Sequence, residues 1–105
     1  MKPGRQPSRY DLVVFKLPRE ESRLAIGRVL GLPGEQMELS SGRVMANDIE
    51  IADPYVTSKA SYSISMSLGQ NEYAVFGDNR DLSDDSHTRG PIGEELIVGS
   101  TTAVP

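Results

Sequence analysis

Residues 11–17, DLVVFKL, and residues 23–32, RLAIGRVLGL, decide the fold class. The first stretch is β-branched and aromatic and ends at Pro18, and the second ends at Pro33 and Gly34. Such residues favour strands, and proline and glycine close them. The two stretches therefore predict a pair of buried strands.

Similar short runs continue along the chain, whereas helical periodicity is hard to find. Residues 35–51, EQMELSSGRVMANDIEI, alternate apolar and polar side chains around the turn signals SSG and ND, which predicts a hairpin and one further short strand. Residues 72–76, EYAVF, and 96–104, LIVGSTTAV, predict two more strands. Residues 52–71 are serine-rich and weakly patterned, which predicts an exposed connection. This spacing predicts an all-β fold, a small closed or partly open antiparallel barrel or sandwich.

Length and composition limit the function classes. A chain of 105 residues predicts a single domain over residues 1–105. The net charge is -4, and the Lys and Arg residues are scattered, so we expect no nucleic-acid partner. The chain contains no cysteine, which excludes disulfides, thiolate metal sites and a thiol nucleophile. It has no apolar run of about 18 residues and no apolar leader, so we expect it to be soluble as given.

The most polar segment is residues 77–90, GDNRDLSDDSHTRG, and a metal loop is the first hypothesis for it. Its acidic residues offer oxygen ligands, but their spacing does not match a calcium loop. The acidic residues are Asp78, Asp81, Asp84 and Asp85. We therefore predict neither a metal nor a cofactor.

Two other readings of this segment remain. Asp, Asn and Ser side chains hold tight turns, and Gly77 and Gly90 permit unusual backbone angles, so the segment can be a purely structural turn. A histidine-based triad is disfavoured, because Ser86 and His87 are adjacent and would face opposite ways on an extended backbone.

Two segments together resemble a known family: GRVLGLPGE at residues 27–35 and GDNRDLSDDS at residues 77–86. With DLVVFKLP before them and GPIGEELIVG after them, the chain resembles the bacterial type I signal peptidases over nearly its whole length. These are membrane-anchored serine proteases that cut leader peptides from exported proteins. The resemblance implies a mostly β fold and a serine nucleophile with a lysine base.

The resemblance also shows where the chemistry departs from the family pattern. The family's lysine immediately precedes the arginine of the Gly-Leu-Pro-Gly strand, and Gly27 occupies that position here. A lysine with an ordinary pKa of about 10.4 acts as a base near neutral pH only in an apolar pocket that lowers its pKa by roughly three units. The family's Ser-Met-x-Pro nucleophile motif, upstream of the DLVVFKLP-like strand, does not occur in these 105 residues, and neither does a membrane anchor.

Other residues are weak replacements for the missing groups. The SMS sequence at residues 65–67 copies part of the nucleophile motif but lies after the Gly-Leu-Pro-Gly turn and lacks the proline. Lys16 lies at a strand end, and Lys2 and Lys59 have polar neighbours that would not lower a pKa. None of these residues can take the place of the family's lysine at position 27 without rearrangement of the chain.

The resemblance leaves a predicted site scaffold without reacting groups. Arg28 and Asp78 would form an ion pair, Ser83 matches the serine that hydrogen-bonds the family's lysine, and Asp85 matches an acid that pairs with an arginine, here His87. Histidine in place of the arginine weakens that pair. We therefore expect the order of the loop or the melting temperature to change with pH near the histidine's ordinary pKa of about 6.5. The complete scaffold is Arg28, Asp78, Asn79, Arg80, Ser83, Asp85 and Ser86.

These observations favour a signal peptidase I-like domain that binds an extended peptide or exported precursor and is itself inactive as a hydrolase. The alternative is a non-catalytic binding or assembly factor for exported or surface proteins. A structural β domain with coincidental motifs is the third possibility, and it predicts that Arg28, Asp78 and Ser83 lie far apart. The resemblance implies an extracytoplasmic location at the outer face of the cytoplasmic membrane, with membrane contact only through segments outside this chain. The sequence does not indicate an oligomeric state.

Overall fold

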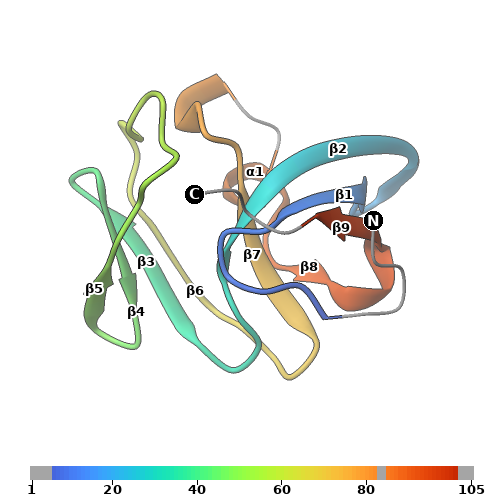
Figure 1. Cartoon of the computed structure of the whole chain (residues 1–105), viewed down its shortest axis with the longest axis horizontal. Helices are drawn as coiled ribbons and strands as arrows, with labels where there is room; N and C mark the ends of the chain where they lie inside the picture. Colours follow the sequence, from blue (N-terminus) through green and yellow to red (C-terminus); the bar gives the residue numbers. More distant parts are fainter. Residues whose placement is uncertain (1–5, 83–84, 102–105) are drawn as a thin grey trace.

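The fold consists of two antiparallel β-sheets that lie side by side (Figure 1). The structure, a computed structural model, describes residues 6–82 and 85–101. The first sheet has the order β8-β7-β2-β1-β9, and the second has the order β5-β4-β3-β6. The first comprises β1 (Leu12–Leu17), β2 (Glu20–Gly31), β7 (Glu72–Phe76), β8 (Ile92–Gly93) and β9 (Ile97–Thr101). The second comprises β3 (Gln36–Ser40), β4 (Arg43–Ala46), β5 (Ile49–Ile51) and β6 (Ile64–Ser67).

The predicted all-β fold is confirmed, and helices are confined to short turns. These turns are η1 (Arg80–Leu82), α1 (Ser86–Arg89) and η2 (Glu94–Leu96). Among residues 6–82 and 85–101, no helix has the length and apolar character needed to cross a bilayer.

The two predicted turns of the second sheet have the backbone that tight hairpins require. Ser41 and Gly42 join β3 to β4 with φ values of 54° and 75°, and Asn47 and Asp48 join β4 to β5 with φ values of 50° and 67°. Two central residues with positive φ are the mark of a type I′ turn, whose twist matches that of the paired strands. The predicted hairpin and following strand are therefore confirmed.

Two strands were missed, the two-residue β8 and the longer β6. Residues 64–67 lie in the segment predicted to be an exposed connection, but they form β6 and pair with β3 from Leu39↔Ile64 to Gln36↔Ser67. The strand carries only two apolar side chains among serines, so pairing with β3 rather than local propensity decides its conformation. The remaining connection, residues 52–63, is called the β5–β6 connection below.

The core consists of two buried clusters, and β2 and β7 of the first sheet contribute to both. The first is built around Phe15, Val29 and Val75, and the second around Leu30, Met37 and Phe76. β2 serves both, because its consecutive residues Val29 and Leu30 face opposite ways. The end of β2 therefore joins the two halves, and Gly27 and Arg28 lie just before this point.

Candidate functional site

The predicted ion pair between β2 and the loop after β7 is present. Arg28 donates two hydrogen bonds to Asp78, from Nε to Oδ1 and from Nη2 to Oδ2, both at 3.0 Å. Its third nitrogen donates to the carbonyl oxygen of Tyr10 at 2.9 Å, and its guanidinium lies 3.9 Å from the centre of the Tyr55 ring. The fork geometry and the aromatic contact suit arginine specifically. Position 28 and the Gly-Asp-Asn-Arg loop are thus held in direct contact.

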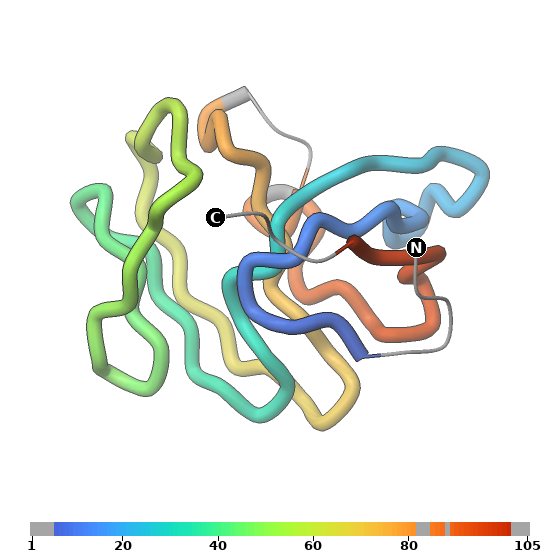
Figure 2. Tube along the Cα trace, viewed as in Figure 1, coloured from blue at the N-terminus to red at the C-terminus, as the bar shows by residue number. Residues whose placement is uncertain are grey.

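Arg80 is more deeply buried than Arg28, with only 2% of its surface exposed. It donates to both carboxylate oxygens of Asp53, at 2.7 and 2.9 Å, and to the carbonyl oxygen of Gly77 at 2.8 Å. The backbone of Asn79 forms an isolated parallel bridge with Ser58. The β5–β6 connection therefore lies against the Gly-Asp-Asn-Arg loop, as the adjacent green-yellow and orange segments of the trace show (Figure 2).

Asp85 and Ser86 close the same loop from its other end. Asp85 Oδ2 accepts the backbone N–H of Gly77 at 2.8 Å, and its Oδ1 accepts that of His87 at 2.9 Å, which caps α1. Ser86 is fully buried, and its Oγ accepts the backbone N–H of Val75 at 2.9 Å. Both side chains are therefore engaged with backbone donors and fix the loop's shape.

The buried Asp85 carboxylate predicts a pH dependence of stability. Burial raises the pKa of Asp85, although the hydrogen bonds from Gly77 and His87 oppose that rise. Because the folded-state pKa lies above the ordinary value of 3.8, the free energy of unfolding should increase, through this group, as the pH falls through the folded-state pKa toward 3.8. Urea unfolding of the wild type and Asp85→Asn between about pH 7 and about pH 4 isolates the group. We expect wild-type stability, relative to the variant, to rise on acidification, and a fall would contradict the assignment.

His87 lies on a short helix rather than on an extended backbone. Its ring stacks on Tyr62 of the β5–β6 connection, with ring centres 3.5 Å apart and planes 2° apart. Ser86 is buried whereas His87 is exposed, so the two side chains do diverge. The structure gives His87 a stacking role, and a histidine pH response near 6.5 stays a prediction.

Gly27 lies buried on β2, beside Arg28. A Cβ atom placed on it would lie 2.6 Å from Cγ1 of Val75 and 3.5 Å from Cε1 of Phe15. The first distance is too short for real atoms, so a side chain at this position requires Val75 to move. The nearest atoms are the side chains of Val75 and Phe15 and the carbonyl oxygen of Phe76, at 3.4 Å, so the surroundings are mainly apolar, as a lysine of lowered pKa requires.

Next to Gly27, one edge of β2 is open. β7 pairs with β2 only at Arg28, Val29 and Gly31, so among the described residues no strand pairs with residues 20–27 on that side. Leu24 and Ile26 project from this stretch and are 60% and 69% exposed. An unpaired strand edge flanked by exposed apolar side chains is suited to pairing with an extended peptide.

The other sequence candidates do not converge on Gly27. Ser65 pairs with Glu38 in the second sheet, Lys16 is exposed on β1 opposite Leu24, and Lys59 is exposed in the β5–β6 connection. Ser83, Asp84 and Lys2 lie outside the described residues. No group of three or more His, Asp or Glu side chains within the described part of the chain could hold a metal ion.

The sequence did not point to Asp53 or Tyr55, the partners of Arg80 and Arg28. A buried arginine needs a carboxylate partner, but any of the chain's 15 acidic residues could supply it.

Comparison with known proteins decides the family. A family model described as "Signal peptidase, peptidase S26" matches residues 2–104. The chain belongs to this family. It is 33% identical to signal peptidase I V of Bacillus subtilis over 106 residues, covering 87% of this chain and 62% of that protein. It is 32% identical to thylakoidal processing peptidase 1 of Arabidopsis thaliana, covering 90% of this chain and 31% of that protein.

A solved structure supports the same fold. The crystal structure of a signal peptidase I from Enterococcus faecalis superimposes with a TM-score of 0.81 at 24% identity, over 93% of this chain and 98% of that one. The resemblance to signal peptidases is therefore confirmed, and the fold is that of the family. The chain spans less than two thirds of the two sequence relatives named above.

Proposed function

We propose that this signal peptidase I-like domain binds an extended peptide of an exported precursor and does not hydrolyse it. The observation that carries the proposal is Gly27, which stands at the position of the family's lysine base. A serine hydroxyl is a weak nucleophile unless a neighbouring base accepts its proton. Without a side chain at position 27 no such base is available there, in this chain or in any longer protein that contains it.

Peptide binding is supported by the preserved surroundings of that position. The open edge of β2 offers backbone partners over residues 20–27, and Leu24 and Ile26 offer apolar contacts. The ion pairs of Arg28 with Asp78 and of Arg80 with Asp53 hold the adjoining loop. A domain of this kind would work as a non-catalytic binding or assembly factor for exported proteins, at the extracytoplasmic face of a membrane where the family acts.

A titration tests binding and hydrolysis together. The probe is a synthetic peptide with the Ala-x-Ala segment typical of leader cleavage sites, added to the ¹⁵N-labelled chain. We expect saturable shifts of the Ala25, Ile26 and Gly27 amides and an intact peptide by mass spectrometry. Addition of lysine alone, by Gly27→Lys, should not restore cleavage, because these 105 residues contain no Ser-Met-x-Pro motif.

Matched variants locate the binding edge. Ile26→Asp should weaken binding, whereas Ile49→Asp, at a residue of equal exposure on β5 of the other sheet, should not. Cleavage by the unaltered chain would overturn the proposal of inactivity, and equal effects of the two variants would overturn the proposed edge.

A further inference from the structure

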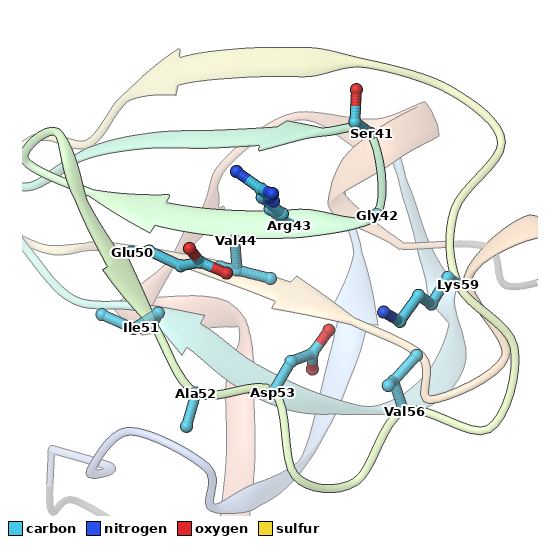
Figure 3. A pocket seen from close by; sticks show the side chains of 10 residues that line it. All are labelled: Ser41, Gly42, Arg43, Val44, Glu50, Ile51, Ala52, Asp53, Val56 and Lys59. Atoms are coloured by element: carbon cyan, nitrogen blue, oxygen red, sulfur yellow. The ribbon is translucent and has the colours of Figure 1, made fainter.

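A pocket with a volume of about 510 Å³ lies between the β4–β5 hairpin and the β5–β6 connection (Figure 3). It belongs to the second sheet and does not include Gly27 or the open edge of β2. Its lining is mostly polar, with a smaller apolar part from Val44, Ile51 and Val56. Its charged side chains are Arg43, Glu50, Asp53 and Lys59. This size is in the range of pockets that bind small ligands.

The charged side chains of the pocket differ in whether they have an ion-pair or hydrogen-bond partner. Asp53 is neutralised by its paired hydrogen bonds with Arg80. Lys59 extends its ammonium group into the pocket, and Glu50 directs its carboxylate toward the same space (Figure 3). Within residues 6–82 and 85–101, neither Lys59 nor Glu50 has an ion-pair or hydrogen-bond partner for its side chain. Arg43 lines the pocket as well, and it too has no ion-pair or hydrogen-bond partner among the described residues. The pocket thus presents two unpaired positive charges and one unpaired negative charge on a mostly polar lining.

We propose that this pocket binds a peptide segment that carries an aspartate or glutamate side chain. The ligand's carboxylate would pair with Lys59, and its backbone N–H groups would face Glu50. A simple anion such as phosphate fits less well, because it has no N–H groups to offer Glu50 that would offset the repulsion between two anions. β5 also favours a peptide, since it is the edge strand of its sheet and its outer side pairs with no other described strand.

An occupant of this pocket would contact the segment that supports the Gly-Asp-Asn-Arg loop. Asp53 holds Arg80, and Ser58, next to Lys59, bridges to Asn79. Binding would therefore restrain the β5–β6 connection and, through it, the loop that carries Asp78. This site does not depend on the peptide edge of β2, and the two can be tested in one spectrum.

The test uses the ¹⁵N-labelled chain and three probes: the capped peptide Ac-Ala-Asp-Ala-NH₂, its analogue with Asn in place of Asp, and inorganic phosphate. We expect the Asp peptide to shift the amides of Gly42, Ile51 and Lys59 and to bind about three- to fivefold more tightly than the Asn peptide, as befits an exposed ion pair. Lys59→Gln should abolish that preference, whereas the control Lys16→Gln, at an exposed lysine on β1, should keep it.

Several results would overturn the proposal. These are equal binding of the two peptides, an unchanged preference in Lys59→Gln, phosphate binding as tight as that of the Asp peptide, or shifts confined to residues 24–27. Loss of the β2 response to the leader-type peptide, with the Lys59 response retained, would contradict the proposed function alone.

Discussion

Replacement of Asp53 by alanine is expected to lower the free energy of unfolding by about 3–5 kcal/mol, the usual cost of breaking a buried ion pair by removing one partner. Arg80 would keep its bond to the carbonyl oxygen of Gly77 but lose two charged hydrogen bonds while only 2% exposed. Urea unfolding followed by circular dichroism measures the loss. Glu38→Ala, at an exposed acid without a partner among the described residues, is the matched control and should change stability by about 0.5 kcal/mol or less.

A second substitution separates the free-energy cost of an unpaired buried charge from the cost of lost packing. Arg80→Met keeps much of the side-chain volume and removes the buried charge, so Asp53→Ala combined with Arg80→Met should be more stable than Asp53→Ala alone. If the double variant were less stable than the single one by the full cost of Arg80→Met, the two residues would be acting independently. In that case the ion pair would not be what joins the β5–β6 connection to the Gly-Asp-Asn-Arg loop.

The sequence predicted the strands whose local pattern agrees with their final pairing. DLVVFKL and RLAIGRVLGL became β1 and β2, and the SSG and ND signals became turns with positive φ at both central residues. β6 was missed because residues 64–67, ISMS, take their conformation from β3, a partner distant in sequence. Local propensity cannot report such pairing.

The candidate site was predicted where a resemblance linked two distant segments. Arg28 and Asp78 are 50 residues apart and form the expected pair. Asp53 and Tyr55 were not predicted, because their segment had neither a strand pattern nor a matching motif, and their partners are chosen by tertiary packing. The capping role of Asp85 could have been read from its position just before Ser86–Arg89, since aspartate is a preferred N-cap residue.

The second large effect concerns Gly27, the position at which the resemblance places the family's lysine. Gly27→Lys is expected to destabilise the chain by about 1–3 kcal/mol, because its Cβ would lie 2.6 Å from Cγ1 of Val75 in a close-packed region. Gly69→Lys is the matched control, since the Cβ there would meet only the flexible end of Glu72, at 3.2 Å, and should change stability much less. Urea unfolding of both variants measures the difference.

Val75→Ala provides the decisive combination, because it removes the atom that a side chain at position 27 would strike. Val75→Ala alone should cost stability by leaving a cavity, but together with Gly27→Lys the cost should be smaller than the sum, with a coupling energy of about 0.5–3 kcal/mol. The lysine of the double variant would enter apolar surroundings near Phe15, so its pKa should fall below about 10.4, which NMR titration of the side chain can measure. Additive costs together with an ordinary lysine pKa would show that Val75 does not close this space. Coupling would instead show that Val75 and a side chain at position 27 compete for the same space.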